Sequence, residues 1–247
     1  MLTILLMAHL IADFYLQSSK MAENKDSKAW FFAVHSIIYL CVFTAVDFLF
    51  LEPITALFLT LVTAVSHSVI DLIRTKVNKK WKNYTLSFIS FLIDQLLHLA
   101  VIVLAYVVFE LPFRVNSIYN NFETFQIRET NIGFAKIISY GLLLLIILKP
   151  TSILIKKTFE FLFKENSTSE LENHAGEMIG MLERTITAIL LLCNQFAAVG
   201  LVITAKSIAR FKQMENKEFA ERYLIGTLLS LSVPMILTIV FKSIFLL

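Results

Sequence analysis

The chain has 247 residues, of which 57% are hydrophobic and only 17% are charged, and its mean hydropathy is +0.73. A soluble domain carries about 25% charged residues, so this composition excludes a soluble enzyme, a disordered chain and a secreted disulfide scaffold. The net charge of +3 gives no indication of nucleic-acid binding. The composition therefore predicts a polytopic membrane protein.

The sequence contains seven apolar runs that reach or approach the length of about 20 residues that a helix needs to cross a bilayer. The runs cover residues 1–17, 30–51, 54–74, 86–109, 132–155, 185–205 and 223–246. We therefore expect an all-α transmembrane helix bundle of about seven helices. A tight loop with Pro53 joins the second and third runs into a hairpin, and Lys149-Pro150 interrupts the fifth run, where a proline can break the helix.

A polar segment in the middle of the chain suggests a division into parts. We expect an N-terminal four-helix membrane bundle over residues 1–109, an extramembrane loop over 110–131, and C-terminal membrane helices over 132–247 that include a polar, basic loop. Residues 156–177 read as an amphipathic start followed by an exposed loop. Cys41 and Cys193 both lie within apolar runs, and we expect them to be buried as small hydrophobic residues.

The basic residues of the short loops predict the orientation of the helices, because such loops face the cytoplasm. The loops 18–29, 75–85 and 156–177 are basic and are therefore expected inside, which puts the N-terminus outside. The segment 206–222 disagrees: it carries three Lys and two Arg, yet a count of seven helices places it outside. Charge and helix count thus conflict for the last three helices.

The first four apolar runs share an unusual set of ionisable residues. They contain His9 and Asp13, then His35, then His67 and Asp71, and finally Asp94 and His98. Such side chains cost several kcal/mol inside a membrane and usually face a partner or a cavity. A spacing of four residues places both members of a pair on one helix face, one turn apart. Three of the four helices therefore present a His/Asp face.

The depths of these residues also agree. With a rise of about 1.5 Å per residue, the groups on the first three helices lie roughly 5–12 Å from the cytoplasmic ends of those helices. Those on the fourth helix lie roughly 12–18 Å from its start, by the same rise. We therefore expect the four His and three Asp to converge in the cytoplasmic half of one four-helix bundle.

Neutral imidazole and carboxylate together form the ligand set of Zn²⁺, Mn²⁺ or Fe²⁺, and helix bundles build dinuclear sites from such residues. The predicted metal ligands are His9, Asp13, His35, His67, Asp71, Asp94 and His98. The three aspartates, Asp13, Asp71 and Asp94, are also the candidate catalytic bases. Two alternatives use the same residues without a metal: a proton relay, and hydrogen bonds that hold the helices together.

The second half of the chain offers a different kind of candidate site. Arg184 enters the sixth run, and Lys206 and Arg210 lie one turn apart on one face. These cations either mark helix ends and extend toward the interface, or bind an anionic head group or phosphate.

Several strings of the sequence resemble those of a known family. They are His9-x-x-x-Asp13-x-x-x-Gln17, Asp94-Gln95-x-x-His98, Ile-Gly-x-Leu-Glu-Arg, Lys-Ser-Ile-x-Arg-Phe and Tyr-Leu-Ile-Gly-Thr-Leu-Leu-Ser. Together they span the chain from His9 to Ser230, and they resemble the bacterial membrane family called domain of unknown function 3307. The resemblance implies a multi-pass protein of the bacterial inner membrane. The His/Asp pattern is also similar, in residue type only, to membrane-bound metal-dependent hydrolases.

Three functions remain open at this point. The first is a membrane-embedded metal-dependent hydrolase acting on a lipid-like or phosphate-bearing substrate, since a metal with an open position activates water. The second is a transporter or channel for metal ions or protons, which a continuous polar path across the membrane would favour. The third is a non-catalytic membrane scaffold, which bound stoichiometric metal would exclude.

Overall fold

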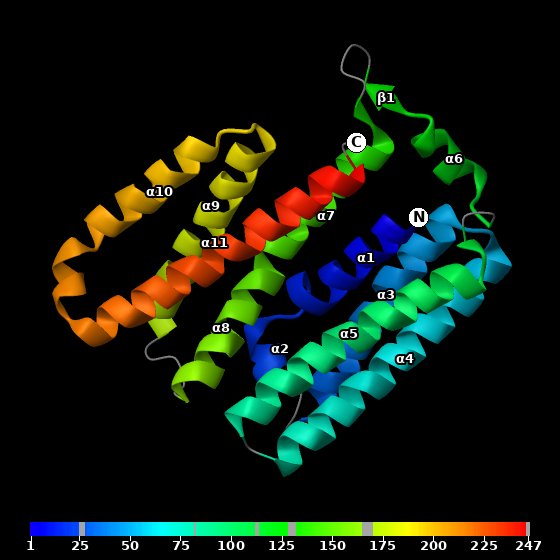
Figure 1. Ribbon diagram of the computed structural model, residues 1–247. Helices are drawn as coiled ribbons and strands as arrows, with labels where there is room; N and C mark the ends of the chain where they lie inside the picture. Colours follow the sequence, from blue (N-terminus) through cyan, green and yellow to red (C-terminus); the bar gives the residue numbers. More distant parts are fainter. Residues whose placement is uncertain (25–27, 82, 112–113, 128–131, 165–169, 246–247) are drawn as a thin grey trace. The chain divides into compact units, whose positions relative to one another are not determined.

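A computed structural model describes residues 1–24, 28–81, 83–111, 114–127, 132–164 and 170–245 of the chain (Figure 1). The chain forms two compact units, Met1–Leu142 and Leu143–Leu247. The described residues are almost wholly helical. The exception is one antiparallel pair of two-residue strands, β1 (Gln126–Ile127) and β2 (Ile132–Gly133). The expectation of a helical bundle is confirmed.

The first unit is built on an antiparallel arrangement of three long helices. Its elements are α1 (Leu2–Leu10), the π-helical turn η1 (Ile11–Tyr15), α2 (Ser19–Asn24), α3 (Ala29–Phe50), α4 (Pro53–Lys80), α5 (Tyr84–Val108), α6 (Ser117–Glu123) and most of α7 (Phe134–Ile147). Pro53 opens α4, a position at which its missing N–H costs nothing. Asn83 caps α5 by accepting a 2.9 Å hydrogen bond from the Thr85 amide. Helix α1 packs against α3 and α5.

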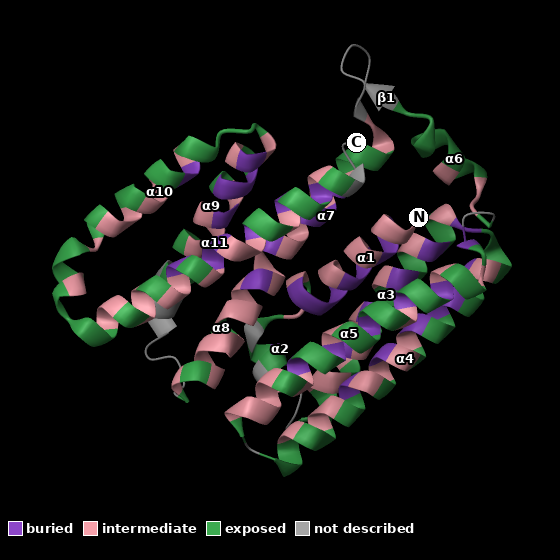
Figure 2. Cartoon of the chain, in the orientation of Figure 1, coloured by how far each residue is buried: buried purple, intermediate pink, exposed green. Residues whose placement is uncertain are grey.

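Figure 2 shows which helix faces of the first unit are buried and which are exposed, and many of the exposed side chains are large and apolar. Helix α4 buries Thr60, Thr63, His67 and Asp71. Its exposed large side chains are Ile54, Leu57, Phe58, Leu61, Val62, Val65, Val69, Leu72, Ile73 and Val77. A soluble domain has the opposite distribution, so the surroundings of this helix are themselves apolar.

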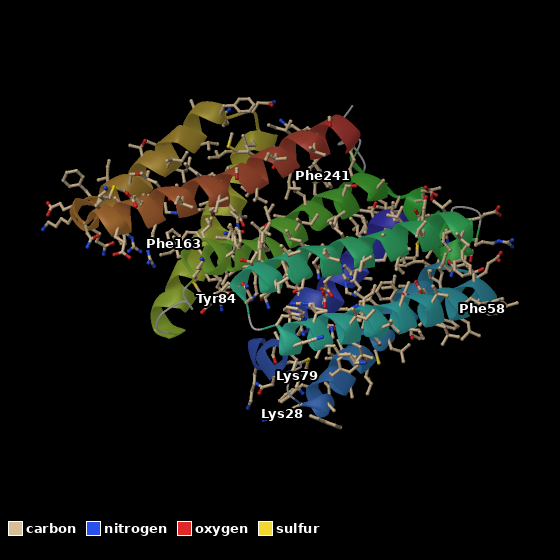
Figure 3. All side chains as sticks on the ribbon, turned by 60° about the horizontal axis from the view of Figure 1, so that its bottom comes forward. Lys28, Phe58, Lys79, Tyr84, Phe163 and Phe241 are labelled. Atoms are coloured by element: carbon tan, nitrogen blue, oxygen red, sulfur yellow. The ribbon has the colours of Figure 1, made fainter. Side chains whose placement is uncertain are left out.

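An apolar core fills one end of the first unit and basic residues mark the other. The core includes Leu5, Phe43, Leu59 and Leu111, and it lies beside the loop that joins α3 to α4. Figure 3 shows Lys28 and Lys79 together at the opposite end from Phe58. The bundle therefore has a basic end, as the short loops of the sequence predict.

Within the described residues, five helical segments are long and apolar enough to cross a membrane. They are Ala29–Phe50, Pro53–Lys80, Tyr84–Val108, Phe134–Phe163 and Lys217–Ser243, the last of which belongs to α11 (Lys217–Phe245). The helical segments Leu2–Tyr15 and Phe196–Ala209 are apolar but shorter. The number of spanning helices thus differs from the seven that we expected.

The expected sixth span over residues 185–205 is wrong, because two helices occupy it: α9 (Glu170–Leu192) and α10 (Phe196–Ala209). The chain turns at Asn194, which has a positive φ of 58°. The amides of Asn194 and Gln195 donate to the carbonyls of Leu191 (3.1 Å) and Leu190 (2.8 Å), which is the Schellman pattern that ends a helix. The Lys242 ammonium adds a 2.8 Å bond to the Leu191 carbonyl.

The α9–α10 hairpin resolves the conflict between charge and helix count. Lys206, near the end of α10, lies 2.6 Å from Glu183 of α9, so the two helices run side by side in opposite directions (Figure 1). At the start of α11, the Arg222 guanidinium lies 4.7 Å from the centre of the Phe163 ring, which ends α8 (Lys149–Phe163). The basic segment 206–222 is therefore at the same end of the second unit as the end of α8. Seven membrane-spanning helices would instead put these two segments on opposite sides of the membrane.

Lys149-Pro150 does break the fifth apolar run, as its sequence suggested. Helix α7 ends at Ile147, and Leu148 has a non-helical ψ of −94°. Pro150 has no N–H to donate, and the Thr151 hydroxyl donates instead to the Ile146 carbonyl at 2.8 Å. The expected loop over 156–177 is mostly helical, since α8 continues to Phe163 and α9 begins at Glu170.

The expectation that both cysteines are buried is wrong. Cys41 and Cys193 are free thiols and are exposed, because they lie on an outward face of α3 and at the α9–α10 turn. An apolar run indicates the environment of a helix as a whole, and it does not indicate which face turns inward.

The second unit generates a topological prediction. In a chain whose Cys41 and Cys193 are replaced by Ser, single cysteines placed at Lys164 and Lys212 should react with a membrane-impermeant thiol reagent from the same side. A cysteine at Lys79, in the basic last turn of α4, should behave like both, and all three should resist the reagent in intact cells. Labelling of Lys164 and Lys212 from opposite sides would restore the seven-helix count.

Candidate metal centre

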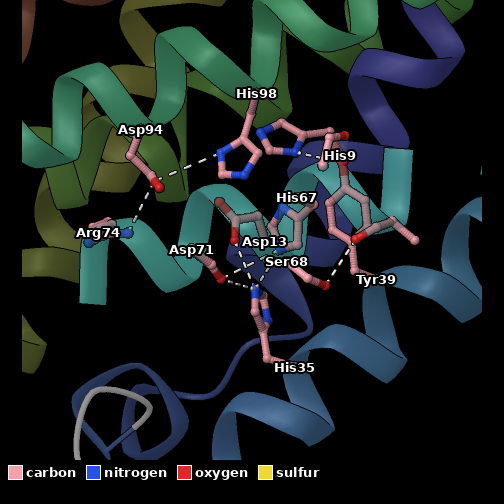
Figure 4. A network of polar contacts seen from close by, with 12 residues as sticks. His9, Asp13, His35, Tyr39, His67, Ser68, Asp71, Arg74, Asp94 and His98 are labelled. Atoms are coloured by element: carbon pink, nitrogen blue, oxygen red, sulfur yellow. Dashed lines mark hydrogen bonds and ion pairs between the residues drawn. The ribbon is translucent and has the colours of Figure 1, made fainter. Parts of the chain in front are cut away.

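All seven predicted ligands lie in the interior of the first unit, and each is no more than 6% exposed. Figure 4 shows them gathered between the helices. They come from five elements: His9 from α1, Asp13 from η1, His35 from α3, His67 and Asp71 from α4, and Asp94 and His98 from α5. The convergence follows from the spacing of four residues on α4 and α5, which keeps each pair on the inward face.

The N-terminal pair is positioned by a local irregularity that the sequence did not predict. After His9 the backbone widens into the π-helical turn, in which the Leu16 amide donates to the Ile11 carbonyl at 2.9 Å. A π-turn rotates the following residues relative to a regular α-helix, and such turns are frequent at functional sites. Asp13 lies within the turn and is buried.

Four of the side chains direct one ligand atom each to a common point. The Nε2 atoms of His35 and His67 lie 3.0 Å apart. Nε2 of His35 is also 3.2 Å from Oδ1 of Asp13 and 3.3 Å from Oδ2 of Asp71. Oδ2 of Asp71 is 3.6 Å from Nε2 of His67. Two imidazoles and two carboxylates from three elements, η1, α3 and α4, thus gather around Nε2 of His35.

These separations match the ligand shell of a small cation. Four N and O ligands about 2.0–2.1 Å from a tetrahedral Zn²⁺ stand about 3.3 Å from one another in six pairs, and four of the pairs here lie 3.0 to 3.6 Å apart. Direct charge-assisted hydrogen bonds are about 2.7–2.9 Å long. The spacing therefore suits a shared cation, while the 3.0 Å contact between the two imidazoles is also a hydrogen bond.

A second position lies next to the first. His9, Asp13 and His98 each offer a ligand atom, and these atoms lie within 4.8 Å of one another. Asp13 also belongs to a group with His35 and His67, so it could bridge two ions. A third group of His67, Asp71 and His98 meets the same limit. The cluster thus has the composition of a dinuclear bundle-core site.

Tyr39 supports two of the histidines. Its ring stacks on His67 with the centroids 3.7 Å apart and the planes 9° from parallel. Its hydroxyl lies 3.4 Å from Nδ1 of His9. A partner on one ring nitrogen fixes the orientation of an imidazole and leaves the other nitrogen for an ion. Sequence reasoning missed Tyr39, although it lies one turn after His35 on the same face of α3.

Asp94 differs from the other six predicted ligands, because it belongs to none of the three groups found among the described residues. Its Oδ2 atom accepts hydrogen bonds from the Arg74 guanidinium and the Gln95 amide, both at 3.1 Å. The same oxygen lies 3.8 Å from Nδ1 of His98. Asp94 therefore lies at the edge of the cluster. Arg74 and Gln95 were not singled out from the sequence, although Arg74 follows His67 by seven residues on one helix face.

The charges of the cluster do not balance within it. Asp13, Asp71 and Asp94 are three carboxylates, and Arg74 is the cation in contact with one of them. Burying an excess of negative charge away from water is very unfavourable unless a proton or a metal ion compensates it. The interior of the first unit is thus built to take up positive charge.

The candidate anion-binding residues lie in the second unit and are not gathered into one site. Arg184 is 3% exposed, and its Nε donates to the Ile147 carbonyl at 2.7 Å. Its other donors reach the Leu148 carbonyl, Ser152 and Ser230. Lys206 pairs with Glu183, and Arg210 donates to Gln213 at 2.8 Å. Anion binding by these residues stays a prediction.

The buried Arg184 has a clear structural task. The break between α7 and α8 frees backbone carbonyls at a depth where water is scarce, and the guanidinium satisfies those of Ile147 and Leu148. Gly180 makes room for it, since a Cβ there would stand 3.1 Å from the guanidinium nitrogen.

The fold and the cluster together define a class: a helical membrane protein with a buried His/Asp centre among its first helices. The family model described as "Protein of unknown function (DUF3307)" matches residues 1–126. That is half of the chain, and the chain belongs to this family. The match includes every residue of the cluster and ends before the three C-terminal strings on which the resemblance also rested. Neither the curated proteins nor the solved structures hold a significant match.

The contacts of Arg184 predict a stability effect. Arg184→Gln should clearly lower the thermal midpoint of the detergent-solubilised protein, because it leaves buried carbonyls without charged donors, each worth about 1.5–3 kcal/mol. Lys206→Gln removes a partly exposed pair and should change stability by less than about 1 kcal/mol. Equal midpoints for Arg184→Gln and the wild type would show that the helix break does not need this residue.

Proposed function

We propose that the chain is a membrane-embedded, metal-dependent hydrolase of the bacterial inner membrane, acting on a lipid-like or phosphate-bearing substrate. The observation that supports this most is the gathering of four ligand atoms from three elements, four pairs of which lie 3.0–3.6 Å apart. Zn²⁺, Mn²⁺ and Fe²⁺ all suit two imidazoles and two carboxylates.

The residues divide into separate roles under this proposal. His35, His67, Asp13 and Asp71 hold one ion, and His9 and His98 hold a second that shares Asp13. A bound ion of this kind polarises an ester oxygen and activates water near neutral pH.

Asp94 is the carboxylate left for proton transfer. Among the described residues its Oδ1 atom has no hydrogen-bond partner, while Oδ2 is fixed by Arg74 and Gln95. A carboxylate that is held in place but keeps one oxygen available has the properties of a general base.

Metal content tests the centre directly. The purified protein should carry roughly one or two transition-metal ions by elemental analysis. His67→Ala and Asp71→Ala should each weaken metal binding at least about tenfold without unfolding the bundle, because they remove ligands of the same ion. A wild-type protein that stays metal-free, after purification without chelator and after exposure to Zn²⁺, Mn²⁺ and Fe²⁺, would rule out the hydrolase.

Two matched controls accompany these variants. His174→Ala removes the one histidine outside the first 142 residues, and Arg210→Ala removes a cation of the second unit; both should keep the metal. Protons compete with metal for neutral imidazole, whose pKa is about 6.5 in model peptides, so metal affinity should fall as the pH is lowered through that region.

A proton or ion relay is the second candidate, and one observation favours it. Asp47 of α3 is fully buried and accepts a 2.8 Å hydrogen bond from Thr60, so polar groups continue beyond the cluster toward the α3–α4 loop. The path is interrupted, however. The Thr63 hydroxyl, which lies between Thr60 and His67 on α4, donates to backbone carbonyls within its own helix.

Asp47→Asn separates the two functions. If the protein is a hydrolase, the variant should keep its bound metal and an ester-hydrolysis rate within about twofold of wild type, since the residue lies outside the centre and shape is preserved. If it is a relay, the same variant should abolish proton or metal flux into proteoliposomes. Flux that depends on Asp47, without hydrolysis, would replace the first proposal with the second.

A further inference from the structure

Arg74 lies at the edge of the cluster and is partly exposed, and it has donors that no other described side chain uses. Its side chain is 20% exposed, while that of its partner Asp94 is 1% exposed. Among the described residues its one hydrogen bond is the 3.1 Å bond from NH1 to Asp94. The guanidinium also lies 5.7 Å from the centre of the Phe91 ring. The planar guanidinium group carries several other N–H groups, which remain available to a ligand.

The position of Arg74 connects the buried centre with the basic end of the bundle. It follows Asp71 by three residues on α4, about 4.5 Å along the helix axis, in the direction of Lys79. Figure 4 shows Asp94 between Arg74 and His98. The Asp94 carboxylate is therefore the group that separates Arg74 from the histidines of the cluster, and a ligand that contacts both would extend past it.

A second donor lies at the same edge. The Gln95 amide donates to Asp13 at 3.0 Å and to Asp94 at 3.1 Å. Gln95 therefore adds an amide donor beside the Arg74 guanidinium, since both bond to the same Asp94 oxygen.

We propose that Arg74 binds the phosphate group of the substrate, which makes the substrate class a phosphate ester. An arginine recognises phosphate oxygens with two parallel N–H groups, whereas a lysine offers only a point charge. This inference rests on the proposed metal centre, because the ions and Arg74 would contact the same phosphate from two sides. The phosphate comes either from a lipid head group or from a water-soluble ester.

Phosphate binding to detergent-solubilised protein tests the inference, with radiolabelled orthophosphate as the probe in equilibrium dialysis. Arg74→Gln should weaken phosphate binding about tenfold or more at unchanged metal content. Its thermal midpoint should fall, because the buried Asp94 carboxylate loses its cation. Arg114→Gln is the matched control, since Arg114 also faces a carboxylate, Glu52 at 3.9 Å, but is 52% exposed and lies far along the chain; it should bind phosphate as the wild type does. Should Arg74→Gln fold poorly, Arg74→Lys keeps the charge and should still bind phosphate more weakly than wild type.

Lipid nanodiscs distinguish the two sources of phosphate. In discs of phosphatidylcholine with added phosphatidic acid, the lipid should displace orthophosphate from the wild type if the substrate is a phospholipid. Without displacement, the substrate is a water-soluble ester.

The failure of this inference is distinct from that of the metal centre. If the metal is retained but wild type binds no phosphate, or Arg74→Gln binds it equally well, Arg74 is not the phosphate site. If phosphate binding depends on Arg74 in a protein that takes up no metal, the anion site stands and the hydrolase falls.

Discussion

The first unit depends on one electrostatic constraint: carboxylates and imidazoles meet at a point that water does not reach. Asp13 and Asp71 each lie within about 3.3 Å of the same imidazole nitrogen of His35, so their charges face each other across that nitrogen. Such a group is stable only with positive charge at its centre. The constraint fixes the register of η1, α3 and α4 at once, because moving any of these three elements by one residue would turn its ligand away from the others.

The second unit meets a different constraint, since its chain is irregular where a membrane offers few partners. The α7–α8 break and the α9–α10 turn both expose carbonyls, and each is matched by a side chain from another element. Arg184 of α9 serves the first, and Lys242 of α11 serves the second. Irregular backbone at membrane depth is tolerated only where protein satisfies it, so these two cations are as necessary to the fold as the apolar faces.

The long helices and most of the candidate site could be predicted from the sequence. The features that could not be predicted depend on contacts between helices. The pairing of His67 with Asp71 four residues later determines a shared face, and hydropathy finds the long helices. Hydropathy does not detect the turn at Asn194, because the backbone bonds and Lys242 that stabilise it depend on tertiary structure. The sequence also did not predict the orientation of Asp94. Its carboxylate lies at the expected depth, but it turns toward Arg74 of the neighbouring helix α4.

The arrangement of donors around the cluster argues for how it is used. The carboxylates of the centre accept hydrogen bonds, each neutral imidazole offers one N–H and one lone pair, and the margin adds two further donors, the Gln95 amide and the Arg74 guanidinium. The guanidinium also places a fixed positive charge beside a centre that contains three carboxylates. This division suits a cation in the middle with an anion at the edge, which is how metal-dependent enzymes divide the stabilisation of a phosphate between an ion and an arginine.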